Sequence, residues 1–443
     1  MKKVSLLITT LVAALWAPTA RAVPVVEDKE KGILINVGAL IQPTFQMTMS
    51  GSNSDTGPCG AGPTDRCSPG IANPRGDGPS YDFFIRRARL MLWGSATKEI
   101  SFFFDTDEPN IGKGGNFSAG GFIVQDAFAT YTFMPEVRLD AGLMLVPFSH
   151  HTLEGATSLN SLDYHSDLVR YPTGRIWRDA GIQIRGVALQ DHLHYRLGLF
   201  EGVRNAALPA LPAAPAPPAP GPTRTLVNPG GVPRLTALVR GNILGVEPDF
   251  FFKGIYFSKT PIISVGAGFD FQPNSVIKLN QSHGHYMAAS ADAFVEYPFT
   301  EADELIVKGN LFWYGEGATT IAGSAMVPSG ALGVFAEAGF RHDWIEPVVF
   351  VDIQSGSKGK TATNPANGTV MAPTVATDIL APHLGVNFWI LKHNFNIKTD
   401  VGYRKTQRTQ LAVNNLGTGV TSPETKLAPQ QDIMWTTQMQ MFF

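Results

Sequence analysis

The chain has 443 residues, in which 35 lysines and arginines stand against 37 aspartates and glutamates, for a formal net charge of −2. A balance this close to neutral excludes the strong basic field by which proteins attract nucleic acid, so we expect no nucleic-acid partner. Charged residues make up 16% of the chain, against about 25% in a typical soluble protein.

The first 22 residues have the three parts of a secretory signal peptide: a start with two lysines, a mostly apolar run over 4–16, and a small-residue cleavage pattern at 20–22 (ARA). The run is too short for a spanning helix, which needs about 20 apolar residues, and no later segment reaches that length. We expect cleavage after Ala22. Residues 23–443 then carry 32 basic and 37 acidic residues, a net charge of −5, outside the cytoplasm.

The two cysteines, Cys59 and Cys67, lie in CGAGPTDRC, within a stretch rich in Gly, Pro, Ser and Asn that predicts a loop. In an oxidising compartment this spacing predicts a local disulfide. A metal site would need further ligands nearby, and the neighbouring sequence offers none.

The end of the chain, QDIMWTTQMQMFF (431–443), alternates strictly from Ile433 onward. Successive side chains of a strand point to opposite faces, so Trp435 and Phe443 share one face and Gln438 lies on the other. Fifteen earlier segments repeat the pattern, with one apolar face and one polar face. The sixteen segments lie near 32–47, 82–94, 99–107, 122–133, 136–147, 179–189, 192–202, 231–243, 262–272, 285–297, 302–315, 331–341, 344–354, 380–391, 394–405 and 431–443.

These segments are mostly about 9–13 residues long, near the length that a transmembrane strand needs and longer than the usual strand of a soluble sheet. Their connections alternate in length. Short ones lie at 97–98, 134–135, 190–191, 342–343 and 392–393, and long ones at 49–81, 108–121, 148–178, 203–230, 316–330, 355–379 and 406–430. Short periplasmic turns and long extracellular loops are typical of an antiparallel, all-β, transmembrane barrel of the bacterial outer membrane.

One further stretch, DFFFKGIYFS (249–258), also looks like a strand. Because single-chain bacterial barrels have even strand numbers, we assign it to an elaborated periplasmic connection and expect 16 strands. The last strand should close against the first with its odd-numbered face toward lipid, since an open edge is not tolerated there. The proline-rich run 206–222, within the connection 203–230, excludes a strand and predicts an exposed loop.

No catalytic motif is recognisable, so we expect no enzyme, no cofactor and no metal site. His150, His151 and His165 form the one histidine cluster of note, and we interpret them as loop histidines that titrate near neutrality. A barrel enzyme would need a His–acid constellation beside a nucleophile, and His150, Asp163 and Ser166 do not show one by their spacing.

Arginines are more informative. Alternation puts Arg87 and Arg89 on one face and Arg86 on the other, near the rim or at a bulge. A lipid-facing arginine at the midplane costs about 2–4 kcal/mol, so Arg87 and Arg89 should face the lumen. The connection 148–178 adds Arg170, Arg175 and Arg178, and the predicted lumen faces of neighbouring strands carry Arg185, Arg196, Arg234 and Arg240.

Two interpretations of these arginines remain open. Guanidinium groups bind phosphate and carboxylate, and rings of arginine or lysine select anions in pores. Alternatively, the arginines pair with acids on facing walls, as in most water-filled barrels. Candidate partners are Asp105, Asp107, Asp163, Asp167 and Asp179.

Four segments resemble a known family: FFIRRARLMLWGSATKEISFFFDTD, VQDAFATYTFMPEVRLDAGLMLVPFSHHTLEGATSLNSLDY, GRIWRDAGIQIRGV and HYRLGLFEG. Their order is similar to that in the phosphate-selective porins of Gram-negative outer membranes, over about residues 80–205. The resemblance implies a 16-stranded barrel, commonly a trimer, whose third loop (148–178) folds into the lumen as the constriction. It implies a basic lining at Arg86 and Arg87, with Arg175 and Arg178 where the loop re-enters the wall.

The sequence departs from that family in its few lysines at the predicted outer mouth and in the several aspartates of its third loop. Lys113 is the single lysine in the first three long loops, so the basic funnel of the outer mouth is thin. We therefore expect a porin for passive diffusion of small hydrophilic solutes, leaning to anions such as phosphate, with membrane lipid as its surroundings and a homotrimeric assembly. A general non-selective porin, or a barrel with a structural or surface-interaction role through its proline-rich loop, is the alternative. A ligand-gated transporter is not expected, because no plug domain precedes the first predicted strand.

Overall fold

The computed structural model describes residues 23–28, 30–51, 79–117, 121–165, 168, 177–202, 231–247, 250–277, 283–315, 330–356, 375–410, 413–415, 420–422, 425–426 and 429–443. Several expectations lie outside these residues and stay predictions. They are the signal peptide 1–22, the Cys59–Cys67 disulfide, the proline-rich connection 203–230, and Arg170, Arg175 and Asp167 of the third loop.

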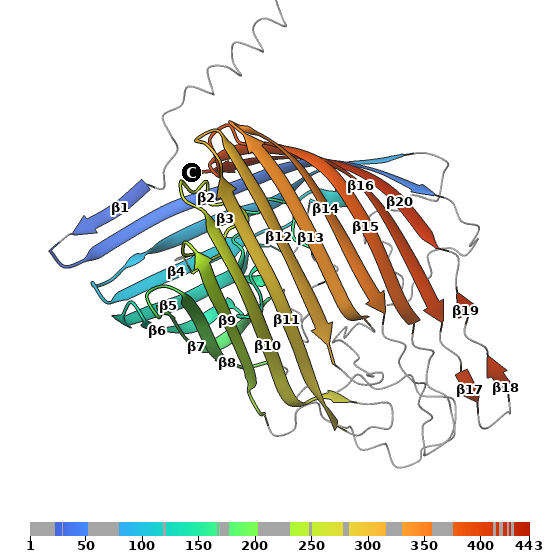
Figure 1. Cartoon of the computed structure of the whole chain (residues 1–443), viewed down its shortest axis with the longest axis horizontal. Coiled ribbons are helices and arrows are strands. Elements are labelled where there is room, and N and C mark those ends of the chain that lie inside the picture. The colour runs from blue at the N-terminus through green and yellow to red at the C-terminus, as the bar shows by residue number, and fades with distance from the viewer. Residues whose placement is uncertain are drawn as a thin grey trace, which may run out of the picture.

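Sixteen antiparallel strands form the wall of a closed barrel (Figure 1). They are β2 (Ile33–Gly51), β3 (Ser80–Ser95), β4 (Ile100–Asp107), β5 (Ile123–Met134), β6 (Val137–Leu145), β7 (Arg178–Ala188), β8 (Leu193–Phe200), β9 (Arg234–Leu244), β10 (Ile262–Ile277), β11 (His283–Pro298), β12 (Asp303–Tyr314), β13 (Gly330–His342), β14 (Ile345–Gly356), β15 (Val375–Phe388), β16 (Phe395–Gln410) and β20 (Gln430–Phe442).

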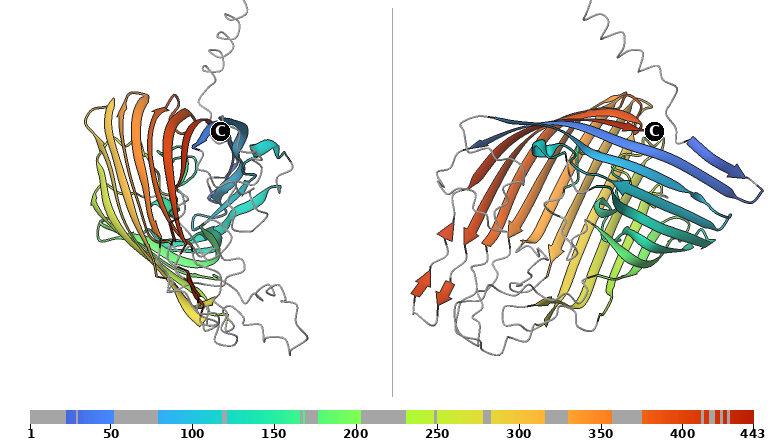
Figure 2. Two further views of the ribbon diagram at one scale, coloured as in Figure 1. Left: turned by 90° about the vertical axis from the view of Figure 1, so that its right-hand side faces the viewer. Right: turned by 180° about the vertical axis from the view of Figure 1, so that it is seen from behind.

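Each wall strand pairs with its neighbour in the chain, and β20 closes the ring by pairing with both β16 and β2. At the closure, Trp435 lies opposite Val401 on one side and Met47 on the other. The views from front and behind show β10–β20 (yellow to red) on one side of the barrel and β2–β9 (blue to green) on the other (Figures 1 and 2). The predicted 16 strands, and closure of the last on the first, are confirmed.

Four short strands lie outside the wall and were not predicted. β1 (Val23–Asp28) extends the sheet by pairing with the start of β2, and β19 (Thr425–Lys426) pairs with the end of β16. β17 (Val413–Asn415) and β18 (Val420–Ser422) form a separate hairpin. Some wall strands also run further than the alternation predicted, since β10 continues to Ile277 and β16 to Gln410.

The alternation separates a lipid face from an inner face. On β9, Leu235 and Val239 are exposed, whereas Arg234, just before Leu235, and Arg240, just after Val239, are fully buried. On β20, Trp435 is exposed and Gln438 is buried, so the odd-numbered face points outward as expected. Because charged groups in contact with hydrocarbon are costly, this alternation fixes the register of every strand.

The described helices are two single turns, η1 (Lys113–Gly115) and η2 (His151–Leu153), and none is long and apolar enough to cross a membrane. The described part of the 249–258 stretch forms no wall strand, which confirms its assignment to a connection.

The cost of a lipid-facing arginine should depend on its depth in the membrane, and β14 allows a test. Val349 faces outward near the middle of this strand, and Ile345 faces outward at its start. Val349→Arg should lower the free energy of unfolding by about 2–4 kcal/mol, and Ile345→Arg by about 0–1 kcal/mol. Urea unfolding in lipid vesicles measures both. Equal losses at the two positions would contradict the assigned lipid face.

Candidate pore constriction

The third loop (148–178), described over 148–165, at 168 and at 177–178, lies inside the barrel and contacts the wall at many points. It begins against β10 and β11, where the Ser290 hydroxyl donates to the Phe148 carbonyl. Gly268 permits this approach, because a Cβ there would lie 1.7 Å from the Phe148 carbonyl oxygen. The Asp292 carboxylate then accepts from the His150 backbone N–H at 3.1 Å.

The middle of the loop crosses to the opposite wall. On β16, the Lys398 ammonium donates to the carbonyls of Leu159 and Ser161, and on β15 the Asn387 side chain donates to the Asn160 carbonyl at 2.8 Å. These contacts satisfy loop carbonyls that water would otherwise solvate. The loop is therefore held from both sides of the barrel.

Glu154 is the buried centre of the loop. Both of its carboxylate oxygens accept from the Lys308 ammonium of β12 at 3.0 Å, and they contact His150 at 3.0 Å and His151 at 3.3 Å. The Tyr164 hydroxyl donates to the Glu154 carbonyl at 2.7 Å. Burial alone would raise the pKa of Glu154, but Lys308 and the two imidazoles hold it well below its usual range.

The loop histidines do not behave as expected. His165 is buried, stacked on Phe335 with ring centroids 4.0 Å apart, and contacts Asp352 at 2.6 Å and Glu337 at 3.4 Å. Burial opposes its charged form, yet the two carboxylates raise its pKa to about 9. Burial lowers the pKa of His151 to about 4 against the opposing effect of Glu154. The prediction of titration near neutrality is wrong for both, because they are interior groups.

These groups do not form a metal centre. Within the residues that the structure describes, no group of three or more His, Cys, Asp or Glu side chains could hold a metal ion. Their carboxylates are instead matched by lysine, arginine and histidine.

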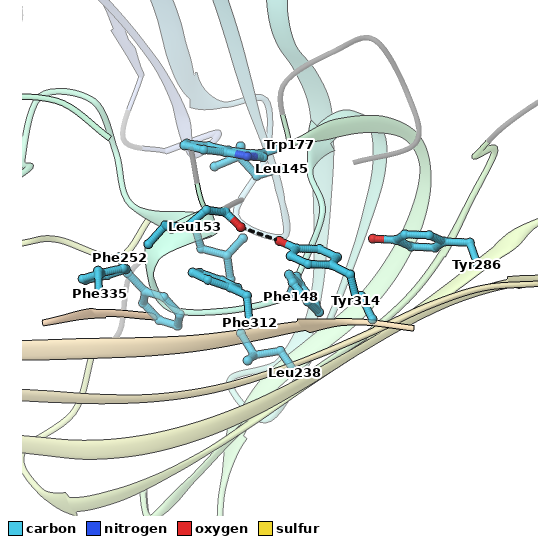
Figure 3. Packing of buried hydrophobic residues seen from close by; sticks show 12 residues of the cluster. Leu145, Phe148, Leu153, Trp177, Leu238, Phe252, Tyr286, Phe312, Tyr314 and Phe335 are labelled. Atoms are coloured by element: carbon cyan, nitrogen blue, oxygen red, sulfur yellow. Dashed lines mark hydrogen bonds between the residues drawn. The ribbon is translucent and has the colours of Figure 1, made fainter. Parts of the chain in front are cut away.

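An apolar cluster fills the space between the loop and the wall (Figure 3). Phe148 and Leu153 come from the loop, and Phe312 and Phe335 come from strands β12 and β13. The Tyr314 hydroxyl donates to the Leu168 carbonyl at 2.9 Å. The third loop is thus packed as a core segment as well as held by hydrogen bonds.

The tip of the loop meets β3 at an irregular position. The register with β2 shifts between Ile41 and Pro43, so that Arg86 and Arg87 together oppose the single residue Gln42. Both guanidinium groups reach Asp163, each at 2.5 Å. The expectation that Arg86 lies on the opposite face from Arg87 is therefore wrong, because the bulge that was predicted as one possibility turns both side chains inward.

The exposed fraction of the side chain differs among Arg86, Arg87 and Asp163. The side chains of Arg86 and Asp163 are 24% and 31% exposed, whereas that of Arg87 is 2% exposed and also donates to Gln42 at 2.8 Å. Burial would raise the pKa of Asp163, but Arg86 and Arg87 hold it well below its usual range. The tip is consequently a charged group that solvent reaches.

The other predicted pore-lining arginines that the structure describes lie on the inner face, and most of them form an ion pair with an aspartate or glutamate. Arg89 contacts Asp105 at 2.9 Å and Asp107 at 3.1 Å, Arg178 contacts Asp126 at 2.8 Å, and Arg185 contacts Asp140 at 2.8 Å. Arg234 pairs with Asp270 and lies 3.5 Å from Asp179, while Arg240 pairs with Asp292 and contacts Glu247 at 2.9 Å. Arg196 donates to the Phe250 carbonyl at 2.7 Å.

Sequence reasoning missed several members of this network: Glu154, Glu247, Lys308, Glu337 and Lys398. Glu154 and Lys308 are 154 positions apart, so no spacing could pair them. The one available signal was alternation, which places Lys308 and Lys398 on the polar faces of their strands.

Residues 71–207 match the family model described as phosphate-selective porin O and P, which confirms the resemblance over that part of the chain. Among solved structures, the outer membrane channel DcaP of Acinetobacter baumannii is similar with a TM-score of 0.50 and 11% identity, over 95% of this chain and 100% of that chain. No curated protein matches.

Two further structures are less similar. OmpF of Salmonella typhi in complex with daunomycin has a TM-score of 0.48 and 11% identity, over 93% of this chain and 100% of that chain. An anion-selective porin from Comamonas acidovorans has a TM-score of 0.46 and 10% identity, over 92% and 99%. At these identities the likeness concerns the fold alone.

The closed wall and the family match define a porin-like barrel of the bacterial outer membrane. Within this class, the part of the chain that forms β3–β8 and the third loop is the part that matches the phosphate-selective porin O and P model.

The raised pKa of His165 predicts a pH dependence of stability. Its ion pairs contribute fully below the unfolded value of 6.5 and are lost as pH rises through about 9. Between pH 6 and pH 9.5 we expect the wild type to lose up to roughly 3 kcal/mol that His165→Gln does not lose. Urea unfolding in detergent measures the difference, with His285→Gln, an exposed position on β11, as the control. Identical pH slopes for wild type and His165→Gln would contradict this assignment.

Proposed function

We propose that this protein is a channel for passive diffusion of small hydrophilic solutes across the outer membrane, with a preference for anions set at the tip of the third loop. The observation that carries the proposal is the ratio of charges there: two guanidinium groups, Arg86 and Arg87, share the single carboxylate of Asp163. The excess is one positive charge at a place that solvent reaches.

Lys113 adds a third cation near Arg86 and Arg87. Its ammonium lies 4.7 Å from the centroid of the Phe84 ring, and burial together with the field of Arg86 lowers its pKa. The Asp82 carboxylate beside it accepts from the backbone N–H of Gly114 at 3.0 Å. Guanidinium and ammonium groups arranged in this way attract phosphate and carboxylate solutes.

The rest of the inner face explains why the preference should be modest. Arg89, Arg178, Arg185, Arg234 and Arg240 are buried and paired with acids, so their charges are largely matched locally. Phosphate is a candidate solute because the matching family is described as phosphate-selective. The local balance of charge supports an anion-leaning pore over a general one. The homotrimer implied by the resemblance is part of the proposal, and its mass in detergent would test it.

Arg86→Gln should shift the reversal potential of single channels under a KCl gradient toward cations. A unit charge at about 4 Å in water is worth about 1 kcal/mol, so the anion-to-cation permeability ratio should fall by up to roughly five-fold. Block of chloride current by phosphate should weaken in parallel. Planar-bilayer recording measures both effects.

Lys405→Gln is the matched control, since Lys405 is exposed on β16 and lies opposite Leu380, an outward-facing residue of β15. It removes a positive charge away from the inner face and should leave the reversal potential unchanged. A wild-type channel that prefers cations would overturn the proposed anion preference.

A further inference from the structure

The connection from β9 to β10 begins at the end of the barrel that bears short turns, yet part of it lies inside the lumen against the third loop. We refer to residues 250–257 as the inner strap. The Phe252 N–H donates to the Leu153 carbonyl at 2.9 Å, and the Phe252 carbonyl accepts from the Gly155 N–H at 2.9 Å. The Gly254 N–H donates to the Ser158 carbonyl at 2.8 Å. The strap therefore adds a short parallel strand-like contact to the loop.

The strap also reaches wall strands well away from its own root between β9 and β10. The ring of Phe250 stacks on Phe128 of β5 with centroids 4.4 Å apart, and Phe251 packs edge-on against Phe103 of β4 at 4.9 Å. Phe252 is fully buried and lies near Leu153 (Figure 3). The strap thus connects its root between β9 and β10 to the inner face of β4 and β5.

The same phenylalanines stack with three arginines of the adjacent wall. The Arg185 and Arg196 guanidinium carbons lie 5.0 and 5.1 Å from the Phe250 centroid. Arg196 and Arg240 lie 4.9 and 5.0 Å from the Phe252 centroid. Guanidinium groups over aromatic faces are attracted by the ring quadrupole, and more strongly where water is excluded.

Glu247, which precedes the strap, ties it to the loop and the wall together. Its carboxylate contacts His150 of the loop at 2.7 Å and Arg240 of β9 at 2.9 Å, and it accepts from the Tyr256 hydroxyl at 3.1 Å. Burial would raise the pKa of Glu247, but Arg240 and His150 hold it well below its usual range. The Ser264 hydroxyl of β10 also donates to it at 2.6 Å, and a buried carboxylate with four partners fixes where the strap enters the barrel.

We propose that the inner strap is a second constriction of the channel, on the side of the short turns, and that it determines specificity by keeping solutes away from Arg185, Arg196 and Arg240. These arginines stack with the strap instead of lining the path of a solute. The inference rests on the proposed channel function, and it assigns the selectivity of the wild type to the loop tip together with the neighbouring Lys113. With the strap displaced, these arginines would lose their aromatic cover, and Arg240 would also lose the Glu247 carboxylate that enters with the strap, so the wall would present more positive charge to small anions such as phosphate.

Gly254→Ala tests the strap with one methyl group. A Cβ at this position would lie 2.4 Å from the Asn160 backbone nitrogen and 2.9 Å from the Ser158 carbonyl oxygen, so the strap must move away from the loop. Gly241→Ala is the control, because its Cβ would meet only Val265 at 3.9 Å. We expect larger single-channel conductance and a reversal potential shifted further toward anions for Gly254→Ala, and no change for Gly241→Ala.

A second pair of variants removes the stacking while leaving the backbone intact. Phe250→Ala combined with Phe252→Ala should give the same gain in conductance and anion preference. The control is Phe117→Ala combined with Phe122→Ala, two exposed phenylalanines between β4 and β5. Unchanged conductance and selectivity in both strap variants would overturn the proposal.

Thiol accessibility separates failure of the strap from failure of the channel, because it needs no current. In a background with Cys59→Ser and Cys67→Ser, His194→Cys places a thiol at a buried position whose native ring packs edge-on against Phe252 at 5.2 Å. A negatively charged methanethiosulfonate reagent should modify it about ten-fold faster when Gly254→Ala is added, as expected if local opening governs access.

The outcomes are distinct. If Gly254→Ala speeds modification of the thiol but no variant conducts current, the role of the strap is supported and the proposed channel function is refuted. Equal modification rates with and without Gly254→Ala would refute the strap, whatever the wild type conducts.

Discussion

The ion pair between Glu154 and Lys308 is the contact on which the interior of this barrel depends. A carboxylate at the centre of the third loop is fully buried, and an unpaired charge there would cost several kcal/mol. Lys308 supplies the opposite charge from β12, and two histidines fill the remaining hydrogen-bonding positions. Because Glu154 is held, Leu153 and Gly155 present their backbone groups at fixed places, and the inner strap pairs with them. Loop, strap and wall therefore form one connected network.

The wall could be predicted from the sequence because lipid imposes a rule on each residue separately. Leu235 and Val239 must face hydrocarbon and Arg234 and Arg240 must avoid it, so alternation alone gives strand, register and face. Because single-chain bacterial barrels have an even number of strands, the segment 249–258 could also be excluded from the wall. The strand ends were less predictable, as in β10 and β16, because beyond the membrane no such rule applies.

The interior could be predicted only in its residue types. Alternation places Lys308, Lys398 and the arginines on the inner face, but which acid meets which base depends on how the third loop crosses the barrel. The pairs Arg86–Asp163 and His150–Glu247 join residues 77 and 97 positions apart, and no local pattern encodes such a separation. The loop histidines illustrate this limit. Because the sequence does not show which carboxylates lie beside His151 and His165, it could not predict the direction in which their pKa values shift.

A bulge explains where unmatched charge remains. Regular alternation spaces inner-face arginines so that acids on neighbouring strands can meet them, as Asp140 meets Arg185. The bulge in β3 breaks this spacing and turns two consecutive arginines to the same side, where one carboxylate from the loop must serve both. Full burial of the surplus charge would be costly, which is consistent with Arg86 staying partly exposed while Arg87 is enclosed. The irregularity of the wall and the excess of positive charge thus have the same origin, and bulges are known to re-aim side chains next to functional sites.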